Sequence, residues 1–159
     1  MTPTVDLPPT PAERELVITH VFDAPRALAF QAWTDPQHLA QWWGPTGWTN
    51  PVCALDVRPG GAIRIHMMDP AGVVYPMEGV FHEIVAPERL VFTSSALADA
   101  AGRPQLAVLN TVTFAEHNGR TLLTLRAVVV QAGPAAADAL AGMAAGWNQS
   151  RDQLAALWS

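Results

Sequence analysis

Few polar residues of this sequence could do chemistry, and no known catalytic motif contains them. The chain has no Gly-x-Ser-x-Gly elbow, no phosphate-binding glycine loop and no His-Glu-x-x-His. Asn110 can donate and accept hydrogen bonds, Tyr75 carries a hydroxyl, and Glu83 would have a raised pKa if it were buried. Together they could serve a cyclase- or hydrolase-type reaction, provided that they face one pocket. For Glu83 we favour the alternative, in which a bulge turns it outward to pair with an arginine.

The histidines and the cysteine do not follow the spacing of a metal site. The sequence has 5 His and 1 Cys, and no two His stand at the short spacing of a helical zinc motif. Cys53 lies in an apolar segment, which favours a buried thiol over a nucleophile. We therefore expect no metal, no cofactor and no catalytic residue. The histidines are His20, His38, His66, His82 and His117.

Composition and charge limit the partners. A net charge of −5 and 9 basic residues among 159 argue against a nucleic-acid partner, because phosphate binding needs clustered Lys and Arg. No apolar stretch approaches the ~20 residues of a membrane span. Residues 1–11 lack the basic and apolar regions of a signal peptide. We expect a cytoplasmic monomer or homodimer with a flexible segment at 1–12 and one domain at 13–159.

Periodicity places these residues on strands and helices. Branched and aromatic residues predict a strand over 14–22, and Asp23 with Pro25 marks the start of a short helix over 25–33. A second short helix is expected over 35–41, with Asp35 as its cap. A final helix begins near Pro134 and runs about 24 residues. Further strands are expected at roughly 48–57, 61–68, 73–85, 89–95, 106–116 and 120–130.

The final helix is amphipathic, with one stripe of side chains expected to pack on the sheet. Steps of three and four residues define that stripe, as on one face of an α-helix. It consists of Leu140, Met143, Trp147, Ser150, Leu154 and Leu157.

Two tight turns predict which side chains face that helix. Asn118-Gly119 is typical of a two-residue type I′ hairpin, and its register puts Asn110 on the inner face opposite Ala127. Asp69-Pro70-Ala71-Gly72 indicates a three-residue hairpin that sets Arg64 opposite Glu78 on the outer face. A slip in the alternation between Phe81 and Ile84 predicts a β-bulge. The inner face then carries Ile63, Ile65, Met67, Tyr75, Met77 and Phe81.

Three tryptophans cluster in the segment after the short helices. Trp42, Trp43 and Trp48 could form an aromatic wall for a ligand near the mouth of a cavity, with indole N–H groups as donors. They could equally fill the core where the short helices meet the sheet.

Six short motifs in order resemble those of a known family. They are Phe22-Asp23-Ala24-Pro25, Trp33-Thr34-Asp35-Pro36, Trp42-Trp43-Gly44-Pro45, Arg58-Pro59-Gly60-Gly61, the segment Pro87 to Thr93, and Gly146-Trp147. The chain resembles bacterial members of the Hsp90-ATPase-activator-like family in the START/Bet v 1-like (SRPBCC) superfamily. The resemblance implies an α+β helix-grip fold, with a curved antiparallel sheet of about seven strands gripping the final helix. It also implies a deep cavity between them. Relatives in the superfamily bind lipids, hormones or polyketides, and a few are cyclases or hydrolytic enzymes.

Arg151 departs from the family pattern, which usually has an apolar residue there. It could meet an anionic ligand, or its long stem could reach the rim of the cavity.

These observations predict the binding of an apolar or aromatic small molecule, lipid-like or polyketide-like, in that cavity. Two alternatives stay open: a cyclase- or hydrolase-type enzyme, and an Hsp90 co-chaperone-like interaction domain by analogy with the family name. The expected ligand-binding residues are Trp43, Trp48, Ile65, Met67, Tyr75, Met77, Phe81, Asn110, Val112, Trp147 and Arg151.

Overall fold

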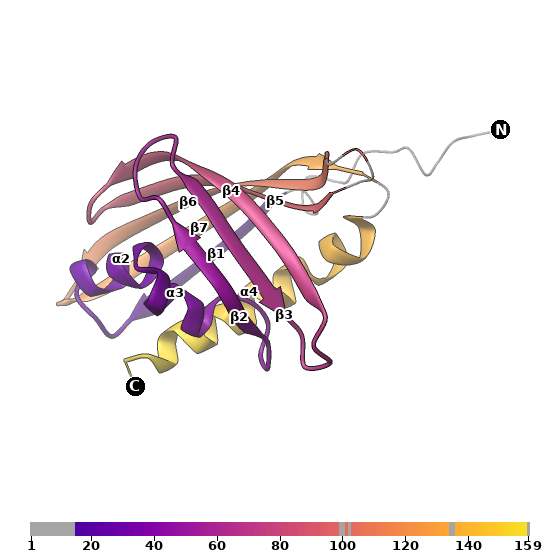
Figure 1. Ribbon diagram of the computed structural model, residues 1–159. Helices are drawn as coiled ribbons and strands as arrows, with labels where there is room; N and C mark the ends of the chain where they lie inside the picture. The colour runs from indigo at the N-terminus through magenta and orange to yellow at the C-terminus, as the bar shows by residue number, and fades with distance from the viewer. Residues whose placement is uncertain (1–14, 99–100, 102, 134–135, 159) are drawn as a thin grey trace.

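The fold is a curved antiparallel sheet with three helices, as Figure 1 shows for this computed structural model. The structure describes residues 15–98, 101, 103–133 and 136–158. The predicted flexible segment at 1–12, and the domain boundary at 13, lie outside these residues. The sheet has 7 strands in the order β1-β7-β6-β5-β4-β3-β2. They are β1 (Glu15–Phe22), β2 (Thr49–Leu55), β3 (Ala62–Met68), β4 (Val74–Val85), β5 (Arg89–Ala98), β6 (Pro104–His117) and β7 (Arg120–Ala132).

The helices are α2 (Arg26–Thr34), α3 (Pro36–Trp42) and α4 (Ala137–Ala156). Figure 1 shows α4, in yellow, lying across one face of the sheet, and the predicted helix-grip architecture is confirmed. The predicted start near Pro134 lies outside the described residues.

The two caps expected for the short helices have different outcomes. Asp35 caps α3 as expected, because its carboxylate accepts hydrogen bonds from the backbone N–H groups of Gln37 (2.9 Å) and His38 (3.3 Å). The prediction that Asp23 caps α2 is wrong: Pro25 is the N-cap residue, without a side-chain hydrogen bond. The Asp23 carboxylate instead lies 3.5 Å from the Arg120 guanidinium.

The register predicted from both hairpin turns is confirmed. Asn118 and Gly119 both have positive φ, 53° and 79°, as a type I′ turn requires. Asn110 accordingly stands opposite Ala127, and Arg64 stands opposite Glu78. The register between β4 and β5 shifts between Phe81 and Glu83, which is the predicted bulge.

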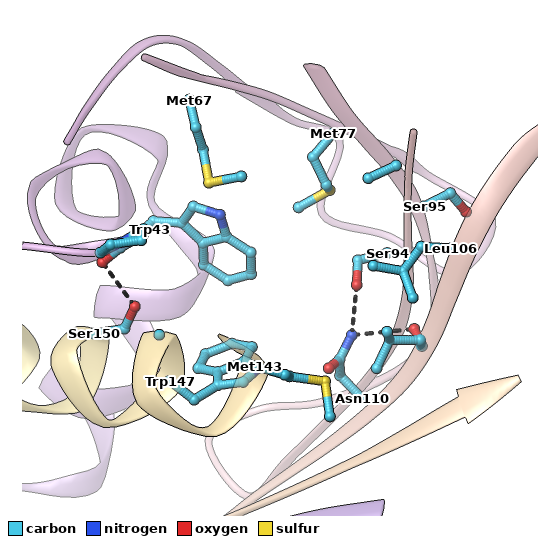
Figure 2. A pocket seen from close by; sticks show the side chains of 15 residues that line it. Trp43, Met67, Met77, Ser94, Ser95, Leu106, Asn110, Met143, Trp147 and Ser150 are labelled. Carbon is cyan, nitrogen blue, oxygen red and sulfur yellow. Dashed lines mark hydrogen bonds between the residues drawn. The ribbon is translucent and has the colours of Figure 1, made fainter. Parts of the chain in front are cut away.

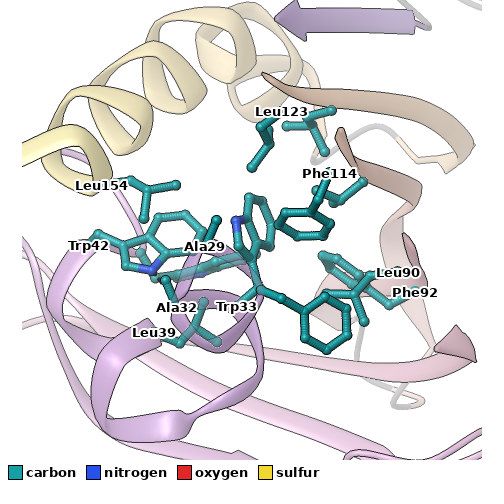
Figure 3. Packing of buried hydrophobic residues seen from close by; sticks show 14 of the residues in the cluster. Ala29, Ala32, Trp33, Leu39, Trp42, Leu90, Phe92, Phe114, Leu123 and Leu154 are labelled. Atoms are coloured by element: carbon teal, nitrogen blue, oxygen red, sulfur yellow. Dashed lines mark hydrogen bonds between the residues drawn. The ribbon is translucent and has the colours of Figure 1, made fainter. Parts of the chain in front are cut away.

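Aromatic side chains fill the core between the short helices, the sheet and the C-terminal half of α4 (Figure 3). Trp33 packs edge-on against Trp42, with ring centroids 4.6 Å apart, and stacks on Trp147 at 6.1 Å. The Trp42 indole N–H donates to the Ala32 carbonyl at 2.9 Å, so this buried ring has its polar group paired. Trp42 is therefore a core residue, in agreement with the interpretation that these tryptophans fill the core.

Candidate ligand-binding site

A cavity of about 200 Å³ lies between the sheet and the middle of α4 (Figure 2). It is open to solvent, and its walls are mostly apolar. The segment between α3 and β2 forms one wall through Trp43, Gly44 and Pro45. From α4 it is lined by Met143, Gly146, Trp147 and Ser150. No charged side chain lines it among the residues that the structure describes.

Sulfur and indole groups make up much of the apolar wall. The thioethers of Met67, Met77 and Met143 face the cavity together with the rings of Trp43 and Trp147. The two indoles meet edge to face, with centroids 5.3 Å apart. Methionine is unbranched and polarizable, and it makes favourable contacts with aromatic rings. Such a wall can pack against flat apolar groups of different shapes.

Asn110 supplies a buried polar group at the sheet side of the cavity. Its residue is 0% exposed. Its amide nitrogen donates to Ser94 Oγ at 3.0 Å and to the Val108 carbonyl at 3.2 Å, and it lies 3.4 Å from the Phe92 carbonyl. Its amide oxygen has no hydrogen-bond partner among the described residues. The amide orientation follows from the chemistry, because backbone carbonyls only accept hydrogen bonds and therefore require the nitrogen beside them.

The wall between α3 and β2 is fastened to α4 by three side chains. Ser150 Oγ and Gln153 Nε2 both donate to the Gly44 carbonyl, at 2.9 and 2.7 Å. Gln149 Oε1 accepts from the Thr46 backbone N–H at 3.0 Å. Gly44 has a φ of +95°, a conformation that only glycine adopts without cost. The cavity wall is thus held to α4 by three hydrogen bonds, of which the Ser150–Gly44 bond is buried.

The structure brings together five of the predicted site residues and separates the others. Trp43, Met67, Met77, Asn110 and Trp147 line the cavity.

The remaining six predicted residues do not line it. Ile65, Phe81 and Val112 belong to the packed core, where their exposed fractions are 2% or less. Arg151 lies beside a small void on the core side of α4, and its guanidinium pairs with Asp152 at 3.0 Å.

Trp48 and Tyr75 lie against each other outside the cavity. Their ring centroids are 5.0 Å apart, and Tyr75 remains 38% exposed. The Tyr75 hydroxyl donates to Asp69 at 3.2 Å. Partial desolvation, together with the Asp69 carboxylate, raises the pKa of this phenol. Both rings lie on strand ends or loops that extend past the cavity.

The residues named for the enzyme alternative do not converge. Glu83 is exposed and pairs with Arg89 (Nε to Oε1, 3.1 Å), as we favoured from the sequence. Tyr75 bonds to Asp69, and only Asn110 lines the cavity. The structure therefore does not bring these three residues into one site.

Several lining residues were not predicted as site residues. Met143 and Ser150 stood on the predicted helix stripe, and that pattern could have indicated them. Ser94 follows from the pairing of Phe92 with Asn110 in the β5–β6 register. No tight-turn motif marks the link between these strands, so the sequence carried no signal for that register. The other missed lining residues are Gly44, Pro45, Ser95, Ala96, Leu106, Val108 and Gly146.

Across residues 15–98, 101, 103–133 and 136–158, no three His, Cys, Asp or Glu side chains gather as metal ligands would. Burial, and secondarily the Asp35 charge, raises the pKa of Cys53 to about 11. No helix in the described part of the chain is long and apolar enough to cross a membrane.

A curved sheet gripping one long helix over a lined cavity defines the class of START-like helix-grip proteins. Within this class, the family described as "Activator of Hsp90 ATPase homolog 1-like protein" matches residues 23–159, and the chain belongs to that family. No curated protein matches the sequence.

Solved bacterial structures share the fold over nearly the whole chain. A protein from Nitrosomonas europaea is 26% identical, with a TM-score of 0.75 over 93% of this chain and 96% of its own. One from Mycobacterium smegmatis is 28% identical, with a TM-score of 0.76 over 92% and 91%. A third, from Chromobacterium violaceum, is 28% identical, with a TM-score of 0.74 over 91% and 96%.

Proposed function

We propose that this protein binds a small, neutral, apolar or aromatic molecule in the cavity under α4. The observation that carries the proposal is an apolar cavity of about 200 Å³ with one buried polar side chain, Asn110, in its wall. Ligand sites are typically concave and apolar, with a few placed polar groups that orient the ligand. An ionised ligand would be desolvated there without a counter-charge, which is costly.

The volume narrows the ligand class predicted from the sequence. A cavity of roughly 150 Å³ holds benzene, whereas drug-sized ligands occupy sites of roughly 300–1,000 Å³. At about 200 Å³ the cavity accommodates one or two rings or a short chain. An extended lipid or a complete polyketide would have to project through the open side.

A size series tests the proposal. Thermal unfolding and tryptophan fluorescence would be followed with toluene, butylbenzene, a C6 alcohol and a C16 fatty acid. Fluorescence reports directly because Trp43 and Trp147 line the cavity. Saturation at 100 times Kd stabilises a protein by about 2.7 kcal/mol, which corresponds to roughly 5–10 °C in Tm at this size.

We expect the single-ring compounds and the short alcohol to raise Tm and change the fluorescence, and the fatty acid to do so weakly. If no compound of the series changes either signal at its solubility limit, the binding function is wrong. The interaction with an Hsp90-type ATPase rests on the family name alone and stays a prediction.

A further inference from the structure

We infer that the ligand carries a neutral hydroxyl group, as in a phenol, which donates to Asn110 and accepts from Ser94. The inference rests on the proposed binding function and specifies the chemistry of the molecule bound. It is carried by the unpaired amide oxygen of Asn110 in the cavity wall.

The amide oxygen requires a donor from the ligand side. Within the described residues, every side-chain hydrogen bond of Asn110 is made by its nitrogen, to Ser94, Val108 and Phe92. Leaving a buried acceptor unpaired costs more than a typical hydrogen bond gains, because the acceptor has lost its water. Figure 2 shows the oxygen turned toward Met143 and Trp147, while the nitrogen of the same amide points to Ser94 and the strands. Because three acceptors already occupy the nitrogen, the oxygen is the part of the amide left for a ligand donor.

Ser94 places a donor next to that acceptor. Its Oγ accepts from the Asn110 nitrogen at 3.0 Å, so the hydroxyl proton is directed elsewhere. Within the described residues, Ser94 Oγ donates no hydrogen bond, and Ser94 also lines the cavity. An acceptor and a donor then lie side by side on one wall. A hydroxyl group matches this pair, because it donates one hydrogen bond and accepts another.

The rest of the wall excludes charged versions of such a ligand. A carboxylate would face the lone pairs of the Asn110 oxygen, and no cationic side chain lines the cavity among the described residues. An ammonium group would bury its charge without a carboxylate partner. The ring preference comes from Trp43, Trp147 and the methionine thioethers, which pack well on aromatic faces.

Three matched probes separate hydrogen bonding from apolar contact. Phenol donates and accepts, anisole only accepts, and toluene does neither, while all three carry one ring. Their Kd values would be measured by fluorescence or NMR titration on the wild type and on Asn110→Leu, Ser94→Ala and Ser95→Ala. Ser95 is the control, since it also lines the cavity but makes no hydrogen bond with the Asn110 side chain. The readout is the toluene-to-phenol ratio of Kd values.

We expect Asn110→Leu to lower that ratio on the order of 10-fold, because it removes the acceptor of the phenol proton. Ser94→Ala should lower it less, and Ser95→Ala should leave it within about twofold. In the wild type, phenol should bind tighter than anisole, which has no proton to donate.

The possible outcomes separate the hydroxyl inference from the proposed binding function. If toluene and phenol both bind and their ratio is the same in wild type and Asn110→Leu, the hydroxyl inference is overturned and the binding function stands. If none of the three probes binds the wild type, the hydroxyl inference is overturned. The binding function is then tested by the size series described under the proposed function. Should Asn110→Leu fail to fold, wild-type binding of phenol no tighter than anisole would overturn the inference.

Discussion

Gly146 allows ligand binding and stability to be changed in opposite directions. It lies on α4 in the cavity wall, and a Cβ added there meets no heavy atom within 4 Å. Gly142, one turn earlier, has the same open space but is exposed and does not line the cavity. A leucine at Gly146 therefore enters the cavity, and a leucine at Gly142 enters solvent. The two substitutions form a matched pair on one helix.

The expected magnitudes follow from helix propensity and from volume. Replacing glycine inside a helix by a good helix former gains about 0.8–1.0 kcal/mol, or roughly 2–4 °C in Tm at this chain length. Gly142→Leu should show that gain alone. Gly146→Leu should show at least as much, because its side chain also leaves water. The same side chain takes part of the roughly 200 Å³ available to a ligand.

Ligand affinity should separate the two variants. Overpacking a filled site costs about 1–3 kcal/mol, which corresponds to a loss on the order of 10- to 100-fold in affinity for Gly146→Leu. Gly142→Leu should bind toluene or phenol as the wild type does. Thermal unfolding gives the stability, and a fluorescence titration gives Kd for the same samples. If Gly146→Leu gains stability and still binds with wild-type affinity, the ligand does not occupy this cavity.

Two further predictions concern titratable groups. Burial acts to raise the pKa of Asp35, but the hydrogen bonds from Gln37 and His38 outweigh it and lower the pKa below its usual value. The stabilisation by this cap is therefore present above about pH 4 and lost as pH falls through the lowered pKa. The Tm difference between wild type and Asp35→Ala should shrink below pH 4, and a difference constant down to pH 2 would contradict this. Cys53, with a pKa of about 11, should react with iodoacetamide at pH 8 roughly 100-fold more slowly than free cysteine. Denaturant should restore the ordinary rate, and equal rates for the folded and free thiol would refute the expectation.

The sequence predicted correctly which face of the sheet many side chains occupy. This was possible because a tight turn and the alternation of apolar and polar residues are local properties. Asn118-Gly119 needs two consecutive residues with positive φ, and pairing then propagates along β6 and β7 to Asn110. Which residues of a strand reach the cavity is not a local property, because it depends on where α4 crosses the sheet. Tyr75 and Met77 share one face of β4, yet Met77 lines the cavity and Tyr75 lies outside it. No local pattern separates those two residues.

Adjacent aromatic residues posed a second problem that local patterns do not solve. Trp42 and Trp43 have the same chemistry, and their roles differ because α3 ends between them. Trp42, inside the helix, turns into the core and bonds to Ala32. Trp43, the C-cap residue with extended φ and ψ, turns toward the cavity. Predicting this difference requires the position of the helix end to within one residue, which sequence patterns rarely provide.

The space beneath α4 is divided in two by the sizes of the residues that face it. Toward the C-terminus, Leu154 and Trp158 meet large partners, and the Trp158 ring lies 5.9 Å from that of Phe22. Toward the N-terminus, Gly146 faces a wall with Ser94 and Val108, whose small side chains do not reach across. Trp147 stands at the boundary: it stacks on Trp33 on the core side and lines the cavity on the other. Trp147 thus belongs both to the core and to the cavity wall, so its truncation would disturb the core packing and the cavity together. Ligand binding is therefore better tested at Gly146 and Asn110, because filling the space or replacing the amide changes neither ring of the Trp33–Trp147 stack.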